Sequence, residues 1–246
     1  MRAIILAAGR GSRMGTLTDD KPKCLIKLAG KTLLQFQLEA LRGAGIDQIG
    51  MVTGYLADQL IIPKIKFFEN IRWGKTNMVA SLACAYEWLR ADTCVVSYSD
   101  IVYSKDAITR LWNKDGDIVI IYDKNWLKLW KTRFDDPLSD AETFQIDEKG
   151  KLLEIGRKAK TIEEIKGQYM GLFKITPKGW KTIKDYLSGL MQKECDIICM
   201  TSLFEGLIRT GVEINTVPII DNWYEIDNEN DLKVCQLMEN LKKEIG

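Results

Sequence analysis

The sequence predicts one α/β domain in which a mixed, mainly parallel sheet is flanked by helices and carries a small β-rich insertion. Three observations lead to this prediction. Residues 3–8 form a continuous apolar run that stops at a glycine loop, as in a strand buried on both faces. Strand-like and helix-like segments alternate through the first half of the chain, which is typical of parallel sheets. The second half changes to hairpin patterns, so we expect a single domain over residues 1–246 with an insertion at about 123–175.

The elements of the first half follow from apolar spacing and from residues that begin or end helices. Leu34, Leu38 and Leu41 recur at the spacing of one helix face. Gly43 and Gly45 follow them and are suited to end that helix. In chain order we expect a strand at 3–8, a helix from Thr32, strands at 49–53 and 61–68, a helix capped by Thr76 with Val79, Leu82, Tyr86 and Leu89 inward, a strand at 93–96, a helix at 106–112 and a strand at 118–121.

The second half is expected to begin with a hairpin and to end with a long amphipathic helix. Pro177 stands where a helix would begin, because proline is favoured in the first turn, and Asp196 is suited to cap another helix. In chain order we expect hairpin strands at 143–147 and 152–155, a strand at 167–175, the two helices, strands at 212–220 and 224–226, and a helix at 228–243 with Leu232, Cys235, Met238 and Leu241 inward.

The composition excludes several kinds of protein. The chain has no histidine, which excludes a Ser-His-Asp or Cys-His catalytic pair, a histidine-bound zinc and the usual general base near neutral pH. Its 35 lysines and arginines nearly balance 34 aspartates and glutamates, so we expect no nucleic-acid partner. No apolar run approaches the roughly 18 residues of a membrane span, and we expect neither a signal peptide nor membrane association. The six scattered cysteines are expected to be buried thiols of a cytoplasmic protein.

The loop after the first strand has the glycines and the cations of a phosphate-binding loop. Gly9 and Gly11 allow backbone N–H groups to approach an anion closely. Met14 occupies the third small position of the dinucleotide fingerprint, which argues against a dinucleotide-binding oxidoreductase, and the P-loop pattern is absent. Four cations near the loop suit a polyphosphate, with solvated surface charge as the alternative for each of them: Arg10, Arg13, Lys21 and Lys23.

Residues Leu6–Met14, followed by Lys21-Pro22-Lys23, resemble the G-x-G-x-R and P-K motif of the nucleotidyltransferases that make nucleotide-sugars and other nucleotide-activated metabolites. The resemblance extends over essentially the whole chain and implies a Rossmann-like fold of the nucleotide-diphospho-sugar transferase type. It implies that residues 6–9 hold the base and ribose, that the loop holds the triphosphate, and that Lys23 neutralises charge at the α-phosphate. The nucleotide-binding residues that it implies are Leu6, Ala7, Ala8, Gly9, Gly11, Ser12, Arg13, Lys23, Asn77, Met78, Ser81 and Asp100.

The same family supplies two aspartates that hold a metal ion, and Asp100 and Asp227 match their positions after a mid-chain and a late strand. Magnesium takes one or two carboxylates and completes its shell with water and phosphate. A helix-capping role is the alternative for either aspartate alone. The resemblance therefore implies a Mg²⁺ cofactor and catalytic roles for Lys23, Arg13, Asp100 and Asp227.

Thr76–Leu82, in which Thr-Asn is followed by Ser-Leu, resembles a segment of small cytidylyltransferases that act on phosphocholine, inositol phosphate or phosphonates. Asn77 and Ser81 would then lie at the edge of the nucleotide base. The alternative is that Asn77 is only a polar residue of the first helical turn and that Ser81 is a small packing residue. CTP is the expected nucleotide. The expected reaction transfers CMP to the phosphate of a small phosphorylated metabolite and releases pyrophosphate and a CDP-linked product. A nucleotide-binding regulatory subunit is the non-enzyme alternative, against which the presence of Lys23 and both aspartates argues.

The insertion is expected to bind the acceptor. The tryptophans and acidic residues of the insertion suit an aromatic and anionic cage for a quaternary ammonium, whereas Arg133 and Lys158 suit a clamp for an amino-acid-like acceptor. A lid whose tryptophans pack on its own hairpin is the alternative. The candidate acceptor-binding residues are Trp126, Trp130, Arg133, Asp140, Glu142, Lys158 and Tyr169.

These acceptor segments are most similar to those of bacterial cytidylyltransferases of capsule modification. A phosphoglutamine-type acceptor is therefore favoured over phosphocholine, a phosphonate or a sugar 1-phosphate. The assembly state is left open, with a homodimer as one of the allowed states.

Overall fold

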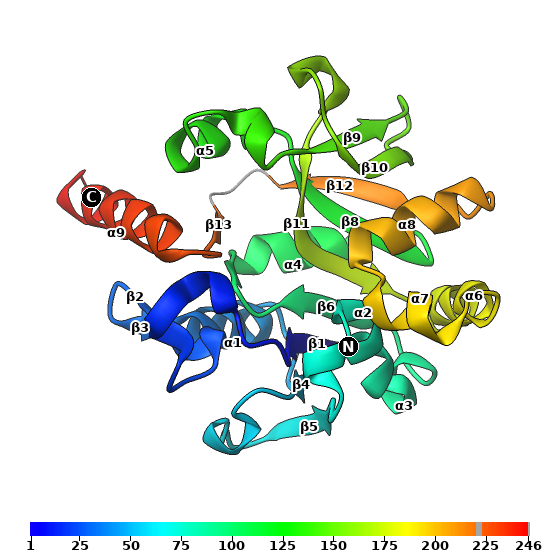
Figure 1. Cartoon of the computed structure of the whole chain (residues 1–246), viewed down its shortest axis with the longest axis horizontal. Helices are drawn as coiled ribbons and strands as arrows, with labels where there is room; N and C mark the ends of the chain where they lie inside the picture. The colour runs from blue at the N-terminus through cyan, green and yellow to red at the C-terminus, as the bar shows by residue number, and fades with distance from the viewer. Residues whose placement is uncertain (220–222, 246) are drawn as a thin grey trace.

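The centre of the molecule is a seven-stranded sheet with the strand order β12-β8-β11-β6-β1-β4-β5 (Figure 1). We describe residues 1–219 and 223–245 of a computed structural model, with side chains up to residue 237. Within these residues the neighbouring strands of the sheet are parallel, except that β11 runs antiparallel to β6 and β8. The predicted mixed, mainly parallel sheet is thus confirmed. Its strands are β1 (Arg2–Ala7), β4 (Gln48–Thr53), β5 (Ile65–Glu69), β6 (Cys94–Tyr98), β8 (Ile118–Asp123), β11 (Gln168–Ile175) and β12 (Asn215–Ile219).

Helices cover both faces of this sheet, which explains the continuous apolar run of β1. Ile5 belongs to the apolar core under α1 and α4, whereas Ile4 and Leu6 belong to the core under α2, α6 and α8. Burying each such side chain stabilises the fold by about 1.5–3 kcal/mol, so neither face of the strand tolerates a polar residue. The helices are α1 (Leu33–Gly43), α2 (Met78–Cys84), α3 (Tyr86–Leu89), α4 (Lys105–Asn113), α5 (Trp126–Arg133), α6 (Pro177–Ser188), α7 (Gln192–Ile197), α8 (Met200–Arg209) and α9 (Glu229–Ile245).

Two predicted helix starts are confirmed. Thr32 precedes α1 and accepts a hydrogen bond from the Gln35 backbone N–H at 3.1 Å, while Gln35 Oε1 accepts from the Thr32 backbone N–H at 2.7 Å. This reciprocal capping box satisfies two backbone donors that the helix itself leaves free. Pro177 occupies the first position of α6, where its missing N–H costs nothing.

Two other cap predictions are wrong. Asn77, not Thr76, caps α2, because the Thr76 hydroxyl already accepts from Asn70 Nδ2 and donates to the Arg72 carbonyl. Asp196 does not begin a helix, since it lies inside α7, and the next helix is capped by Cys199. The last turn of α7 and the first turn of α2 therefore lie next to each other, joined by a hydrogen bond from the Asn77 N–H to the Asp196 carbonyl at 2.7 Å.

Three further predictions about elements are corrected or lie outside the described part. The strand predicted at 61–68 begins only at Ile65, because Pro63 has no N–H and Lys64 adopts a left-handed φ of 64°. Tyr86 is 41% exposed, since the helix predicted around it breaks between α2 and α3. Residue 220 and the side chains of Met238 and Leu241 lie outside the described residues.

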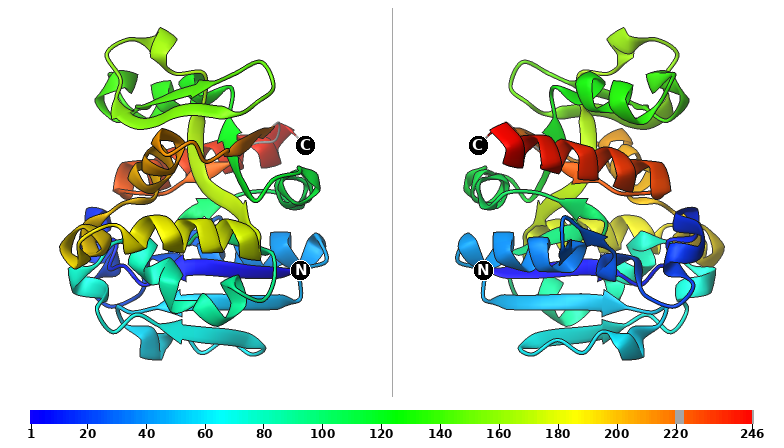
Figure 2. Two further views of the ribbon diagram at one scale, coloured as in Figure 1. Left: turned by 90° about the vertical axis from the view of Figure 1, so that its right-hand side faces the viewer. Right: turned by 90° about the vertical axis from the view of Figure 1, so that its left-hand side faces the viewer.

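The insertion forms a separate layer at one end of the sheet, opposite β4 and β5 (Figure 2). It contains α5, two short 3-10 helices at Pro137–Ser139 and Ile162–Glu164, and the antiparallel pair of β9 (Glu142–Ile146) and β10 (Leu152–Lys158), which confirms the predicted hairpin. The expected insertion does not extend to residue 175. Residues 168–175 form β11, which is hydrogen-bonded to main-sheet strands on both of its edges.

A small ribbon joins the late part of the chain to the middle of the sheet. β7 (Ile101–Val102) pairs with β13 (Tyr224–Glu225), and the Ile226 N–H donates to the Asp100 carbonyl at 3.0 Å. Another ribbon, β2 (Lys27–Leu28) with β3 (Lys31–Thr32), follows the glycine loop. Among the described residues, none of the helices combines the length and the apolarity needed to span a bilayer.

Candidate active site

Three residues that are far apart in the sequence meet at one ammonium group. Lys23 Nζ donates to Asp100 Oδ2 at 2.6 Å and to Asp227 Oδ1 at 2.7 Å. Lys23 begins a 3-10 turn directly after Pro22, Asp100 lies between β6 and β7, and Asp227 follows β13. The ribbon of β7 and β13 brings the two aspartates together, as the sequence resemblance implied.

Burial and charge act in opposite directions on this group. Lys23 is only 7% exposed, and burial alone would lower its pKa, but the charges of Asp100 and Asp227 outweigh it and raise the pKa. Burial would raise the pKa of Asp227, yet Lys23, Arg13 and Arg133 lower it overall. Lys23 and Asp227 are therefore both charged at neutral pH, and each stabilises the ionised form of the other.

The glycine loop is shaped around Lys23. Gly11 has a φ of +68°, and a Cβ atom there would lie 2.8 Å from Lys23 Cδ, so only glycine leaves room for the buried lysine. Arg13 extends from the same loop, is 70% exposed and pairs with Asp227 Oδ2 at 2.7 Å. Gly9 and Ser12 are exposed beside it. The loop thus places backbone N–H groups and one accessible guanidinium next to the Lys23 cluster.

The four loop cations do not gather as one group. Arg10 pairs with Asp19 at 2.8 Å, and Lys21 pairs with its neighbour Asp20 at 3.3 Å. The ion pairs of Arg10 and Lys21 thus involve neither Asp100 nor Asp227. The sequence-based expectation of four cations around a polyphosphate is therefore reduced to Arg13 and Lys23.

The end of β1 lies at the carboxyl edge of the parallel strands, where α/β sheets usually bind ligands. Leu6, Ala7 and Ala8 are buried there. The Ala8 carbonyl accepts a hydrogen bond from the Tyr55 N–H at 2.9 Å, which joins the turn after β4 to the glycine loop. The side chains of Leu6, Ala7 and Ala8 are thus covered, and the binding of base and ribose by residues 6–9 stays a prediction.

Helix α2 packs against β1 and β4, but the polar side chains at its start have partners within the protein. Asn77 Oδ1 accepts from the Met78 N–H at 2.7 Å, and its Nδ2 donates to the Ile197 carbonyl at 3.2 Å. Ser81 is 6% exposed and accepts from Asn70 Nδ2 at 3.0 Å. Recognition of a base by Asn77 and Ser81 stays a prediction.

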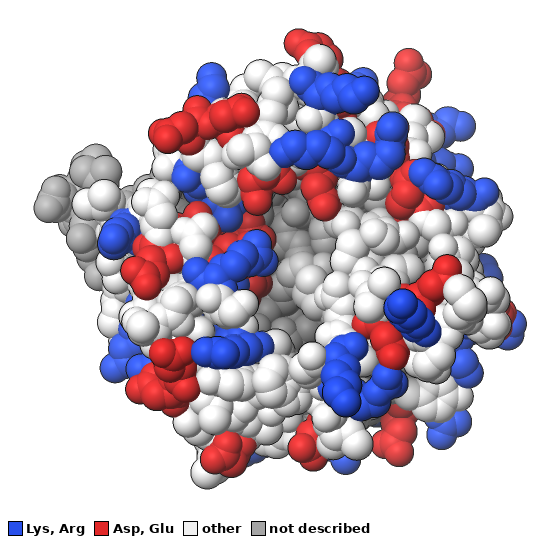
Figure 3. Space-filling model, in the orientation of Figure 1, with Lys and Arg blue, Asp and Glu red and all other residues white. Residues whose placement is uncertain are grey.

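A cavity of about 240 Å³ adjoins Asp227 and lies below the insertion. Figure 3 shows a hollow at the centre of this face, with acidic and basic side chains along its rim. The floor is formed by β6 and β11, and the sides by α2, α5, α8, β9 and β13. The lining residues are Met78, Tyr98, Trp130, Asp140, Glu142, Gln168, Tyr169, Gly171, Cys199, Met200, Thr201, Glu225 and Asp227.

Four of the seven predicted acceptor residues line this cavity. They are Trp130, Asp140, Glu142 and Tyr169, and Trp130 Nε1 donates to Asp140 Oδ2 at 3.2 Å. Burial, followed by the charge of Asp140, raises the pKa of Glu142. Trp126 does not line the cavity. It is 3% exposed, donates from Nε1 to the Ile165 carbonyl at 3.2 Å and packs edge-on against Trp130, so it supports the wall.

The two cations predicted to clamp an acceptor have other partners. Arg133 is buried and pairs with Asp231 at 2.8 Å and Glu225 at 2.7 Å. Lys158 Nζ donates to the carbonyls of Leu138 and Ser139 at 2.6 and 2.5 Å. Lys158 therefore joins two segments of the insertion, whereas Arg133 joins the insertion to β13 and α9. Among the described residues that line the cavity there is no lysine or arginine.

About half of the residues that line the cavity were not among the predicted site residues. The sequence could have predicted Glu225, because it stands two residues before Asp227. In an extended segment, side chains two positions apart lie on the same face. Tyr98, Gln168, Cys199 and Thr201 carried no such signal. They come from β6, β11 and the start of α8, and only the sheet order places these elements around one space.

One buried oxygen near the cavity, Asp100 Oδ1, has no hydrogen-bond partner in the described part of the chain. An unpartnered buried carboxylate oxygen is costly unless a cation or a water satisfies it. Asp100 and Asp227 converge from different elements, and two carboxylates with phosphate and water suit Mg²⁺. Groups of three or more candidate ligands were not found among the described side chains. The residues present therefore fit a cation that is completed by substrate oxygens.

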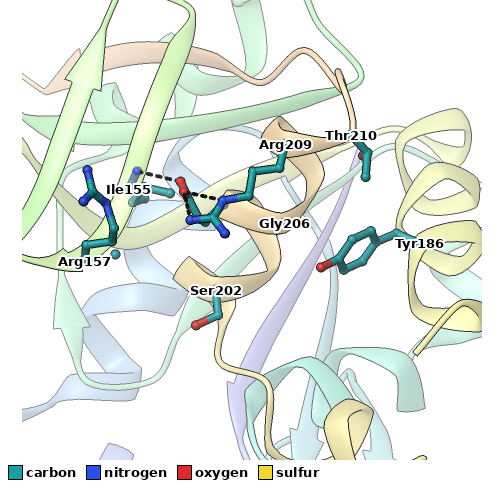
Figure 4. Close-up of a pocket in the computed structure, with 9 residues that line it drawn as sticks. Ile155, Arg157, Tyr186, Ser202, Gly206, Arg209 and Thr210 are labelled. Carbon is teal, nitrogen blue, oxygen red and sulfur yellow. Dashed lines mark hydrogen bonds and ion pairs between the residues drawn. The ribbon is translucent and has the colours of Figure 1, made fainter. Parts of the chain in front are cut away.

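A second cavity, of about 440 Å³, lies between β10, α6 and α8 (Figure 4). Arg157, Arg209 and Tyr186 are among its lining residues. Arg209 is held by Glu205 of the same helix, and Glu205 Oε2 also accepts from the Ile155 N–H at 3.3 Å. This space lacks both the glycine loop and the pair of aspartates, so we take the Asp227 cavity as the candidate active site.

Comparison with known proteins agrees with this geometry. Residues 3–157 match the model of the MobA-like NTP transferase domain, so the match includes the glycine loop, Lys23 and Asp100. The chain belongs to this family. A protein of Campylobacter jejuni subsp. jejuni named CTP:phosphoglutamine cytidylyltransferase is 38% identical over 95% of this chain and 98% of its own length. Membership confirms the family resemblance that the loop motif indicated.

Other relatives share part of the chain or its fold. A choline-phosphate cytidylyltransferase of Haemophilus influenzae is 36% identical over 43% of this chain and 46% of its own length. The structure of the inositol-1-phosphate CTP transferase from T. maritima superposes with a TM-score of 0.77 at 21% identity, covering 98% of this chain and 96% of that one. These findings confirm the Rossmann-like fold of the nucleotide-diphospho-sugar transferase type.

Glu225 makes the stability of the fold depend on pH. Burial raises its pKa to about 7, with the nearby Asp227 and Asp100 adding to the effect and Arg133 opposing it. The folded state therefore holds this proton more tightly than the unfolded chain, whose carboxyl titrates near 4.5. Its contribution to stability is complete below about pH 4.5 and is lost as the pH rises towards 7.

We accordingly expect Glu225→Gln, which does not titrate, to gain stability relative to the natural protein between pH 5 and pH 7. Urea unfolding at both pH values measures the two free energies. A difference between the two proteins that stays the same at pH 5 and pH 7 would show that Glu225 does not titrate in this range.

Proposed function

We propose that this protein is a cytidylyltransferase that transfers CMP from CTP to the phosphate of a small phosphorylated metabolite. The observation that carries the proposal is the convergence of Lys23, Asp100 and Asp227 beside the glycine loop. Membership of the NTP transferase family and the 38% identity to a cytidylyltransferase over 95% of the chain support it. The products are pyrophosphate and a CDP-linked metabolite.

The proposed roles of the loop residues and of Lys23 follow from their charges and hydrogen-bond donors. The backbone N–H groups at Gly11 and Ser12, with the Arg13 guanidinium, bind the triphosphate. Lys23 Nζ stabilises the negative charge that develops at the α-phosphate. An acceptor phosphate oxygen forms a bond to the α-phosphorus as the bond to the bridging β-oxygen breaks, and pyrophosphate leaves. The acceptor phosphate is already an anion at neutral pH, so the reaction needs no general base, in agreement with a chain that lacks histidine.

Asp100 and Asp227 would hold a Mg²⁺ ion. The unpartnered Asp100 Oδ1 and the ionised Asp227 support this assignment. When bound, the ion neutralises phosphate charge as a Lewis acid. We place the reaction in the cytoplasm, because CTP is made and used there.

For the acceptor we favour a phosphoglutamine-type metabolite, as the relative of 38% identity supports. One observation favours a second candidate. The cavity carries Asp140, Glu142 and Glu225 next to Trp130 and Tyr169, whereas the cations that would bind an acceptor carboxylate are committed elsewhere. An acceptor with an ammonium group and no carboxylate, such as phosphocholine or an aminophosphonate, fits this wall.

The decisive experiment measures pyrophosphate release by the purified protein with Mg²⁺ and CTP. The acceptor panel contains phosphoglutamine, phosphocholine, phosphoethanolamine, aminoethylphosphonate and a sugar 1-phosphate. Turnover with phosphoglutamine supports the favoured acceptor, and turnover with the amines alone supports the second candidate. Turnover with the sugar 1-phosphate alone contradicts both acceptor assignments. No turnover with any of them, in a protein that still binds CTP, indicates the regulatory subunit instead.

Replacing Lys23 separates catalysis from folding. We expect Lys23→Met to lower kcat by at least about 100-fold, because the α-phosphate charge loses its buried partner. Circular dichroism should show an unchanged fold. Lys21→Met is the matched control, since Lys21 pairs with Asp20 at the surface, and it should keep most of the activity. Full activity of Lys23→Met would refute the mechanism.

Glu142 tests how the acceptor is recognised. If an acceptor ammonium binds at this wall, Glu142→Gln raises the KM for the acceptor about tenfold, the effect of losing one charge-assisted hydrogen bond, while the KM for CTP hardly changes. Glu148→Gln, in the exposed turn of the same hairpin, is the control. A fall in kcat at unchanged acceptor KM would mean that Glu142 does not bind the acceptor.

A further inference from the structure

Asp231 fixes the backbone on which Asp227 is mounted. Its carboxylate is 1% exposed, and its Oδ2 accepts from the backbone N–H of Asp227 at 2.9 Å and of Asn228 at 3.2 Å. In return, Asn228 Oδ1 accepts from the Asp231 N–H at 3.0 Å. This reciprocal cap at the start of α9 sets the direction in which the Asp227 side chain leaves the chain.

Arg133 binds the opposite side of the same carboxylate. It is the last residue of α5, and its Nε and Nη2 donate to Asp231 Oδ1 and Oδ2 at 2.8 and 3.2 Å. Its Nη1 donates to Glu225 Oε2 at 2.7 Å. The two-point contact with Asp231 holds the carboxylate plane in one orientation, which a single-point lysine contact would not do.

The surroundings of Arg133 keep it in this place. Its guanidinium lies 4.9 Å from the ring centroid of Trp130 and 5.0 Å from that of Phe134. The side chains of Arg133 and Asp231 are 2% and 1% exposed, so neither charge has water as an alternative partner. To bind an acceptor, Arg133 would have to leave one buried carboxylate uncompensated, which is strongly unfavourable.

Through Trp130 the same guanidinium also supports the acceptor cavity. Trp130 lines that cavity and donates to Asp140, another lining residue. One buried side chain therefore contacts both the cavity wall of the insertion and the carboxylate that orients Asp227.

We propose that Arg133 and Asp231 form a positioning pair that holds Asp227 against Lys23 and links this arrangement to the wall of the acceptor cavity. Arg133 is thus a positioning residue and not an acceptor ligand. The proposal rests on the proposed function in one respect, namely that Asp227 takes part in the transfer reaction.

The kinetic test uses Asp231→Asn and Arg133→Lys. Both variants are expected to lower kcat about 100-fold, since a displacement of about 1 Å at a reacting group has an effect of this size, and to raise the Mg²⁺ concentration for half-maximal rate. The KM for the acceptor should change by less than about threefold in Asp231→Asn, because Asp231 does not line the cavity. Arg157→Lys, in an exposed ion pair with Glu154 of the same insertion, is the control and should behave like the natural protein. A raised acceptor KM at unchanged kcat would overturn the proposal, because that is the result expected of an acceptor ligand.

A second readout does not depend on activity. In metal-free crystal structures of Asp231→Asn and Arg133→Lys we expect Asp227 to have lost its 2.7 Å hydrogen bond to Lys23 Nζ. An intact bond in both variants would overturn the positioning role whatever the kinetics. If the natural protein shows no transfer with any acceptor, the proposed function fails, while the crystal structures still decide the positioning role.

A double variant tests the positioning role if one of the single variants does not fold. Should a single variant not fold, Arg133→Met combined with Asp231→Asn removes both charges of the buried pair, and Glu225, the other partner of Arg133, keeps access to water because its side chain is 23% exposed. This double variant is expected to fold and to show the same loss of kcat and of the Asp227 to Lys23 bond. A folded double variant with normal kcat would overturn the proposal.

Discussion

The buried ammonium of Lys23 is the interaction on which the arrangement of the candidate active site depends. A charge that is 7% exposed is stable only with opposite charge in direct contact, and Asp100 and Asp227 supply it at 2.6 and 2.7 Å. The three residues lie in an early loop, after a central strand and near the end of the chain. Gly11 leaves the space that the lysine occupies, and the ribbon of β7 and β13 brings the two carboxylates together.

The sheet turns this cluster into a site. The parallel strands β1, β4 and β6 end at the same edge, so their loops surround the cluster, and the antiparallel β11 crosses between β6 and β8 to form part of the cavity floor. The insertion and the start of α8 close the sides. Because the attacking group of the proposed reaction is itself an anion, positioning and charge stabilisation are sufficient, and a chain without histidine is adequate for it.

The cavity wall is acidic and aromatic. Carboxylates and aromatic rings face the space, while Arg133 and Lys158 hold the insertion in place. The cation of Arg133 still affects the site, since its pairing with Asp231 and Glu225 keeps two acidic residues of the β13 and α9 region in fixed positions. A buried arginine thus connects the shape of the insertion with the orientation of Asp227.

The sequence by itself determined the sheet class, the family and the members of the Lys23 cluster. The apolar run of β1 requires cover on both faces, and the glycine loop followed by Pro22-Lys23 carries the family resemblance that the match over residues 3–157 confirms. Tertiary structure alone decided which side chains face the cavity. Tyr98, Cys199 and Thr201 come from β6 and α8, which the sheet order brings together, and Arg133 became a positioning residue because Asp231, almost 100 positions later, lies within hydrogen-bond distance. Local periodicity indicates which face of a helix or strand is apolar. It does not indicate which distant residues meet, because these contacts depend on how all the elements pack together.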